Sequence, residues 1–193
     1  MTLALVSGSP SLDLVTIGNV DRLSRLRDLA LGQHRVVAHL SADHDSQSAR
    51  NILGARLDRV VADAEAPVML IAEGAGCFAA AWWARLTPDS YVSRVAGAVF
   101  YAPVADARAA RTAAAHFASP QTRLPFPSLL IDDRDALADD RVDALAVSWG
   151  SRPFGMIGEA DTPWRRARRM VTRFTAGIVE LDTLRADKLR GTR

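Results

Sequence analysis

The segment from Val68 to Ala84 constrains the fold of this chain more than any other. It begins with four apolar residues, Val68–Ile71, a run typical of a strand that is buried on both faces of a parallel sheet. Small residues at positions 72, 74, 75 and 76 then allow a very tight turn, and the alanine-rich residues that follow predict a helix. The segment therefore predicts a strand–turn–helix unit of an α/β protein.

This unit has the architecture of a nucleophile elbow, in which a serine stands at the centre of a G-x-S-x-G motif. The corresponding residues here are Ala72–Gly76, and Gly74 stands at the centre. The central residue of such a turn is commonly held at positive φ, which costs a residue other than glycine about 1–3 kcal/mol. Gly74 removes this strain and also removes the hydroxyl group. The sequence thus predicts the elbow, over Glu73–Gly76, without its nucleophile.

A second interpretation takes residues 74–79 as G-x-G-x-x-A, the turn that binds dinucleotides. That motif requires an acidic residue about 20 positions further on, at the end of the next strand. The next strand is predicted from Val95 and ends at Val104, and the first acidic residue after it is Asp106. The dinucleotide interpretation is therefore the weaker of the two.

Strand and helix patterns alternate along the rest of the chain. Further strands are predicted at residues 3–6, 34–40, 95–102, 128–131 and 154–157, and helices at 21–29, 53–61, 105–119 and 139–149. Leu14–Ile17 fits either an extension of a strand or the lining of a loop. The alternation predicts an open, mostly parallel central sheet flanked by helices.

Length and composition indicate one domain with a sizeable core, because the chain has 193 residues, 49% of them hydrophobic. The single cysteine, Cys77, excludes an internal disulfide and suits a reducing compartment. No stretch reaches the roughly 20 apolar residues of a membrane span. Met1–Ser7 lacks the features of a secretory signal. We therefore expect a cytoplasmic protein without a membrane partner.

The C-terminal segment is strongly basic. Residues 165–193 hold nine Lys or Arg and three Asp or Glu, a balance of +6, so the rest of the chain, with +2 overall, balances at −4. Apolar residues recur there at helical spacing, which predicts a long helix that either packs on the domain of residues 1–164 or forms a dimer contact. A solvated basic face is a better explanation of the charge than nucleic-acid binding. A homodimer is the expected assembly.

The order and the amino-acid sequence of these elements resemble those of the small serine hydrolases of the YdeN and retinoblastoma-binding-protein-9 family. The resemblance is carried by Leu70–Cys77, Val95–Pro103, the Leu-Pro-Phe-Pro-Ser stretch of Leu124–Ser128, and Gly158–Ala160. Together these pieces cover roughly positions 66–162. The resemblance implies an α/β-hydrolase-like three-layer sandwich.

The resemblance also implies where a catalytic triad would lie. The nucleophilic serine would fall at Gly74, the acid at Asp135 in the loop after the strand 128–131, and the histidine at Thr162. Asp161 and Thr162 precede Pro163, which is the pattern of an N-cap and the first turn of a helix. This pattern favours loss of the base. A triad needs a nucleophile, a base and an orienting acid, so Asp135 alone supports no such chemistry.

Other residues offer weaker replacements. Ser7, Ser9 and Ser11 follow the strand at 3–6, where the family builds half of its oxyanion hole, and Cys77 is expected to face the core. The histidines at positions 34, 39 and 44 flank the second strand, away from the expected base. His116 lies in a segment that can cap the cleft, where a surface or lid role is the commoner one. No spacing of His, Cys or acidic residues predicts a metal site.

The sequence therefore favours a protein on a hydrolase scaffold that has lost the triad chemistry and binds a small molecule or a protein. It predicts no cofactor and no metal. The expected ligand-binding residues surround the elbow: Ser7, Ser9, Glu73, Gly74, Ala75, Asp135 and Asp161. Acidic residues at 73, 135, 159 and 161 are expected near the rim of the pocket. The alternative is an enzyme, either an esterase-like hydrolase with unusual residues or a non-hydrolytic enzyme that uses the same pocket.

Overall fold

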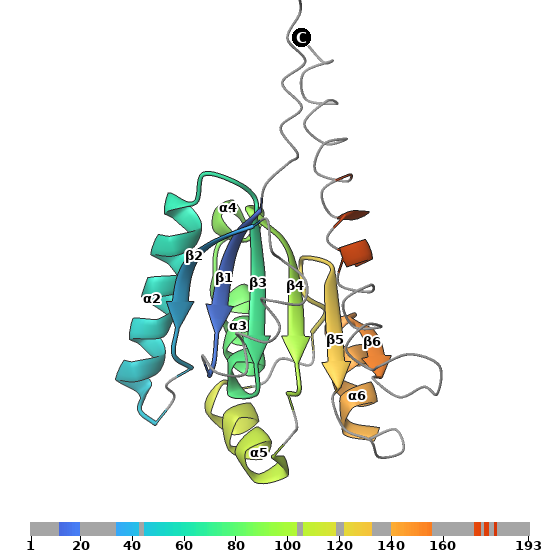
Figure 1. The fold of residues 1–193 in the computed structure, drawn as a ribbon. Coiled ribbons are helices and arrows are strands. Elements are labelled where there is room, and N and C mark those ends of the chain that lie inside the picture. The colour runs from blue at the N-terminus through green and yellow to red at the C-terminus, as the bar shows by residue number, and fades with distance from the viewer. Residues whose placement is uncertain are drawn as a thin grey trace, which may run out of the picture.

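A single six-stranded sheet organises the part of the chain that the computed structural model describes: residues 12–19, 34–42, 45–103, 106–118, 122–132 and 140–155, with 172–174, 176, 177 and 180. The strands are β1 (Asp13–Ile17), β2 (Arg35–Leu40), β3 (Val68–Glu73), β4 (Val95–Tyr101), β5 (Ser128–Asp132) and β6 (Arg152–Gly155). Their order is β2-β1-β3-β4-β5-β6, and every neighbouring pair is parallel. All carboxyl ends therefore lie along one edge (Figure 1). The predicted parallel α/β sheet is confirmed.

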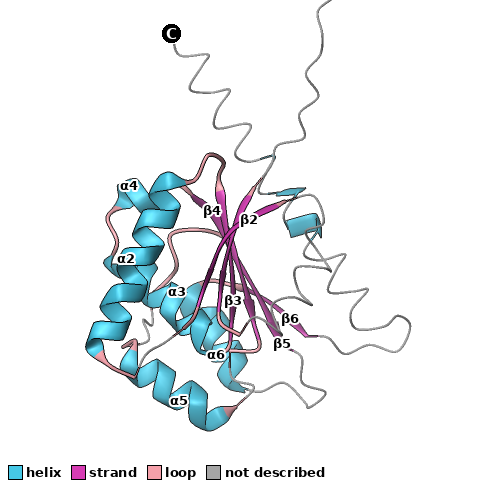
Figure 2. Ribbon diagram, turned by 60° about the vertical axis from the view of Figure 1, so that its left-hand side comes forward, coloured by secondary structure: helices cyan, strands magenta, loops and turns pink. Residues whose placement is uncertain are grey.

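The described helices of residues 47–149 cover one face of this sheet (Figure 2). They are α2 (Gln47–Asp63), α3 (Ala75–Leu86), α4 (Asp89–Val92), α5 (Ala107–His116) and α6 (Asp140–Trp149). Helical residues 172–174 lie on the opposite side of the sheet. Ser46 caps α2 by accepting from the Ala49 N–H at 3.1 Å, as N-cap residues do. None of the described helices is both long and apolar enough to cross a membrane.

The central strands are buried on both faces, which explains their continuous apolar runs. Side chains of one face join the core beneath α2–α6, for example Leu70 and Phe100. Their neighbours along the same strands, Met69 and Val99, point the other way and are equally buried. Alternate residues of one strand thus pack into two different layers, because successive side chains of a strand point to opposite faces.

Some predicted elements have other bounds in the structure. The helix predicted at 53–61 begins six residues earlier, at Gln47. Leu14–Ile17, for which the sequence allows either a strand or the lining of a loop, belongs to β1, the second strand of the sheet, between β2 and β3. The strand predicted at 154–157 begins two residues earlier, at Arg152. Gly150 has φ +65° and ends α6, and the Ser151 N–H donates to the Ala146 carbonyl at 2.9 Å, so the chain turns directly into β6.

Several predicted elements lie outside the described residues. They are the strand at 3–6, the helix at 21–29 and most of the basic helix after position 165. The division into a domain of residues 1–164 and a terminal helix, and the homodimer, therefore stay predictions.

A buried carboxylate, Asp13, joins three segments at the amino end of β1. Its side chain is only 2% exposed. It accepts two hydrogen bonds of 3.0 Å from the Arg35 guanidinium and further bonds from the N–H groups of Glu65 (3.0 Å) and Ala66 (3.2 Å). Burial by itself raises the pKa of Asp13, but the hydrogen bonds from Arg35 and the two backbone groups outweigh it, so this pKa lies below its ordinary value.

Replacing Asp13 by Asn is expected to lower the free energy of unfolding by about 2 kcal/mol at pH 7, because Arg35 loses its anionic partner. The folded pKa is the lower one, so the stabilisation by Asp13 is complete above the unfolded value of about 3.9 and is lost as the pH falls through the folded value. Urea unfolding at pH 7 and at pH 3 measures both effects. Asp63→Asn, in the exposed Arg59–Asp63 pair, is the control and should change stability little. Equal losses in the two variants would contradict this account.

Candidate functional site at the carboxyl edge of the sheet

The turn between β3 and α3 has the predicted sharp geometry. Gly74 adopts φ +53° and ψ −121°, and α3 begins at the next residue, Ala75. The Gly74 N–H donates to the Tyr101 carbonyl at 3.1 Å, which ties the turn to the end of β4. The Cys77 N–H donates to the Gly74 carbonyl, also at 3.1 Å, and closes the first turn of the helix. The predicted elbow at Glu73–Gly76 is therefore present in the structure.

The two glycines of this turn serve different purposes. Among the residues that the structure describes, none lies within 4 Å of a Cβ atom added at Gly74, and it is the positive φ that favours glycine there. A Cβ atom added at Gly76 would lie 2.2 Å from the carbonyl oxygen of Ile17, at the end of β1. Gly76 thus allows α3 to approach the backbone of β1, and Gly74 allows the sharp turn at the apex of the elbow.

Glu73, which the sequence predicts near the rim of the pocket, is largely buried among the described residues. It is 8% exposed, and its Oε2 atom accepts a hydrogen bond from the Asn19 N–H at 3.3 Å. Gly18 packs against it so closely that a Cβ there would lie 2.9 Å from the Glu73 carbonyl oxygen. Gly18 and Asn19, the two residues directly after β1, thus pack against Glu73. The side chain therefore joins β3 to these two residues.

Ala102, directly after β4, adopts φ +45°, a conformation that costs a residue with a Cβ atom free energy. It is fully buried, and its N–H donates to the Ile131 carbonyl of β5 at 2.8 Å. A strained residue thus stands beside the elbow at the same edge. The sequence gives no signal for it other than the following Pro103, which disfavours the α region for the residue before it.

Cys77 faces the core, as predicted. It is fully buried, and its Sγ atom lies 3.4 Å from the Ala72 carbonyl oxygen and 3.6 Å from that of Tyr101. Burial, reinforced by the charge of Glu73, raises the pKa of the Cys77 thiol well above its ordinary value. This thiol is therefore inert as a nucleophile at neutral pH.

The described histidines have separate locations. The Leu12 N–H donates to Nδ1 of His34 at 3.3 Å at the amino end of β2, and burial lowers the pKa of His34. His39 lies on β2, and β1 separates that strand from β3, which leads to the elbow. Its Nδ1 atom lies 2.8 Å from the hydroxyl oxygen of Thr16. His116 is exposed at the last position of α5. The structure brings neither His34 nor His39 to the elbow.

The remaining predicted site residues lie outside the described part of the chain. They are Ser7, Ser9, Ser11, His44, Asp135, Glu159, Asp161 and Thr162. The structure describes only the strand that leads to Asp135, β5, which ends at Asp132 at the carboxyl edge. The roles of these residues therefore stay predictions.

Comparison with known proteins agrees with this geometry. The model of a family described as serine hydrolase matches residues 25–161. A solved structure of a YdeN-like hydrolase from Pectobacterium atrosepticum superimposes with a TM-score of 0.59 at 17% identity, covering 87% of this chain and 92% of that one. Comparison with curated proteins gives no match. The chain belongs to the serine hydrolase family and has the α/β-hydrolase fold of the YdeN-like proteins.

Proposed function

We propose that this member of the serine hydrolase family is a binding protein that has lost the catalytic nucleophile and base. The observation that carries the proposal is Gly74, which stands at the apex of the elbow with no side chain. The resemblance to the family puts a serine at this position. A glycine there supplies no atom that attacks a carbonyl carbon.

The surroundings of two described nucleophiles, Cys77 and Ser128, do not favour a catalytic role for either. Cys77 is buried in the core with a raised pKa. Ser128 begins β5 at the amino edge of the sheet, and its hydroxyl oxygen lies 2.6 Å from that of Ser151 in a buried pair. Cys77 is therefore sealed from solvent, and Ser128 is buried at the edge of the sheet opposite the elbow. These positions support a binding role over acyl transfer.

In this proposal the protein also lacks the catalytic base. The resemblance puts the catalytic histidine at Thr162, which has no titrating nitrogen. The ligand would then occupy the space above the elbow, bordered by Gly74, Ala75 and the predicted residues Ser7, Ser9, Asp135 and Asp161. Glu73 lies beneath this position and accepts a hydrogen bond from the Asn19 N–H. The bound partner is a small molecule or a protein segment.

Hydrolysis of p-nitrophenyl butyrate tests this function. The protein is expected to turn the ester over no faster than the buffer, because neither a nucleophile nor a base is available. Gly74→Ser is expected to remain near background for want of the base. Saturable turnover that disappears on heat denaturation would contradict the proposal and favour the alternative, an esterase with unusual residues.

A further inference from the structure

A pocket lies at the amino edge of the sheet, where β5 and β6 begin. Its lining includes Ser128 and Arg152, the first residues of these two strands, whereas the elbow follows the carboxyl end of β3. The pocket and the elbow therefore lie at opposite edges of the sheet. The pocket has a volume of about 560 Å³, within the range of about 300–1,000 Å³ that is usual for small-molecule sites.

Three arginines from three parts of the chain line this pocket: Arg123 before β5, Arg152 at the start of β6 and Arg173 in the C-terminal segment. All three are exposed. The described lining residues include no carboxylate, and along the sequence no acidic residue lies within six positions of any of the three. Glu180, seven positions after Arg173, does not line the pocket. Since arginine is always charged, the pocket gathers three positive charges, and their mutual repulsion favours the binding of an anion.

The turn after α6 positions Arg123. Gly150 has φ +65°, and a Cβ atom added there would lie 2.7 Å from Cγ and 2.8 Å from Nε of Arg123. The Arg123 side chain therefore crosses Gly150 at a distance that a residue with a Cβ atom would not allow. The Leu124 N–H donates to the Trp149 carbonyl at 2.9 Å, which ties the backbone next to Arg123 to the same turn. This packing reduces the conformational entropy that the side chain loses when it binds an anion.

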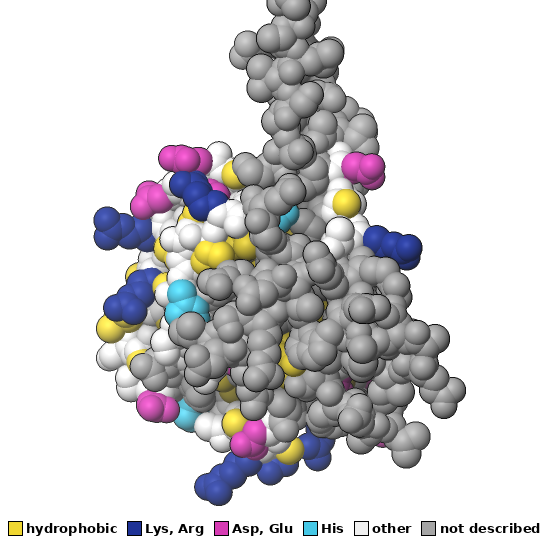
Figure 3. All heavy atoms as spheres, in the orientation of Figure 1, with side chains coloured by type: hydrophobic (Ala, Val, Ile, Leu, Met, Phe, Trp, Pro, Cys, Tyr) yellow, Lys and Arg dark blue, Asp and Glu magenta, His cyan; other side chains and the backbone are white. Residues whose placement is uncertain are grey.

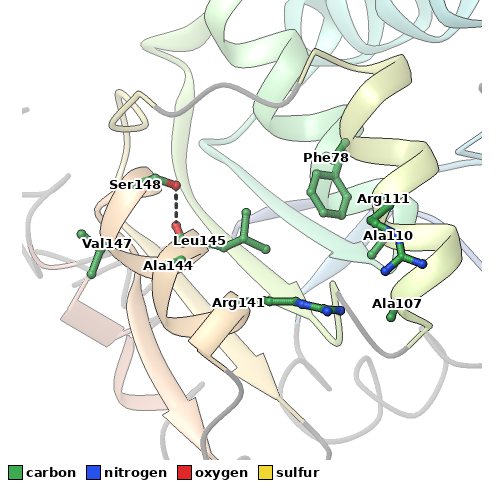
Figure 4. Close-up of a pocket in the computed structure, with 10 residues that line it drawn as sticks. Phe78, Ala107, Ala110, Arg111, Arg141, Ala144, Leu145, Val147 and Ser148 are labelled. Atoms are coloured by element: carbon green, nitrogen blue, oxygen red, sulfur yellow. Dashed lines mark hydrogen bonds between the residues drawn. The ribbon is translucent and has the colours of Figure 1, made fainter.

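The arginines of a larger groove, between α5 and α6 with α3 at its base, have different surroundings (Figure 4). Arg141 lies between Asp140 and Asp143 in the first turn of α6. Arg111 attracts the carboxylate of Asp106 electrostatically. On the face drawn in Figure 3, basic side chains likewise lie beside acidic ones along the upper left and lower edges. Acidic neighbours thus accompany these basic groups, unlike the three arginines at the amino edge.

The other walls of the pocket at the amino edge are largely apolar. Leu124 and Phe126 belong to the hydrophobic core and also line the pocket, and Phe174 lines it from the C-terminal segment. Pro125 and Pro127 alternate with them and have no N–H group to donate to a ligand. These walls suit an apolar group attached to the anion.

We propose that this pocket binds a phosphomonoester with an apolar body, with the phosphate among the three arginines and the apolar part against Leu124, Phe126 and Phe174. A phosphomonoester carries a charge of about −1.5 to −2 at pH 7 and three acceptor oxygens, so it suits several guanidinium groups better than a singly charged carboxylate does. An inorganic anion would leave the apolar walls without a contact. The site is separate from the elbow, so it is additional to the binding role proposed above and does not rest on it.

Titration calorimetry with phenyl phosphate tests the site. Saturable one-to-one binding is expected, with weaker binding of inorganic phosphate and none of benzyl alcohol. The double variant Arg123→Gln, Arg152→Gln is expected to weaken the binding of phenyl phosphate at least about tenfold, because it removes two charge-assisted contacts. The double variant Arg56→Gln, Arg85→Gln is the matched control, since it removes the same charge from exposed positions of α2 and α3 that do not line the pocket.

A second pair of variants keeps the test decisive if the first double variant does not fold. Gly177 lines the pocket, and a Cβ atom added there would meet no described residue within 4 Å. Gly177→Glu is therefore expected to fold and to abolish the binding of phenyl phosphate, because it places a carboxylate in the pocket. Ala176→Glu adds the same charge at the neighbouring exposed position, which does not line the pocket, and should retain most of the affinity.

Absence of saturable phenyl phosphate binding, or equal affinities in the pocket variants and their controls, would overturn the inference. Inorganic phosphate that binds as tightly as phenyl phosphate would overturn the assignment of the apolar walls. Tighter binding of a single-stranded oligonucleotide, with an affinity that falls steeply as the salt concentration rises, would also overturn the inference and assign the arginines to a nucleic-acid surface. None of these results bears on the elbow, which the hydrolysis of p-nitrophenyl butyrate tests separately.

Discussion

Replacing Gly76 by Ala is expected to lower the free energy of unfolding by about 3 kcal/mol, which is a large part of the stability of a typical domain. The added Cβ would lie 2.2 Å from the carbonyl oxygen of Ile17. That oxygen belongs to the backbone of β1, which is paired on both sides, so it cannot move away without disturbing the sheet. Urea unfolding followed by circular dichroism measures the loss.

The matched control is Gly74→Ala, two residues away in the same turn. Its Cβ would meet no described residue within 4 Å, so the expected cost comes from the positive φ of +53° and is about 1 kcal/mol. The expected order is therefore a severe loss at position 76 and a mild loss at position 74. Equal losses in the two variants would contradict the close packing of α3 on β1.

Replacing Trp149 by Ala is expected to cost about 4 kcal/mol, because the change removes a large, fully buried side chain from the core. The Trp149 ring contacts Phe78 of α3 at a centroid distance of 5.7 Å and Phe100 of β4 at 5.2 Å, both edge to face. It therefore holds α6 against the helix and strand beside the elbow. Thermal unfolding by calorimetry provides the measurement.

Val147, two residues earlier in α6, is the control for Trp149. Its side chain is 83% exposed, so Val147→Ala should change the free energy of unfolding by less than about 0.5 kcal/mol. Unfolding of both variants at the same temperature would show that exposure does not distinguish these two positions, contrary to the described packing.

The sequence predicts the features that depend on neighbouring residues. The apolar run of β3 and the small residues after it determine a buried strand and a tight turn locally, and both are present. The sequence leaves Leu14–Ile17 open between a strand and a loop, because the polar residues Asp13 and Thr16 interrupt the apolar pattern of β1. Asp13 is tolerated there because Arg35 pairs with it from 22 positions further along the chain.

The surroundings of Glu73 depend on tertiary contacts, which the sequence does not predict. The sequence alone suggests a solvated carboxylate, whereas in the structure Gly18 and Asn19 pack against Glu73.

Labelling with a fluorophosphonate, read by intact mass, tests the loss of the nucleophile most directly. The wild-type protein is expected to remain unlabelled, because such probes require an activated serine and Gly74 occupies the apex of the elbow. The double variant Gly74→Ser, Thr162→His is the positive control, and labelling at position 74 is expected in that variant only. A stoichiometric adduct on any serine of the wild-type protein would contradict the account and identify the true nucleophile.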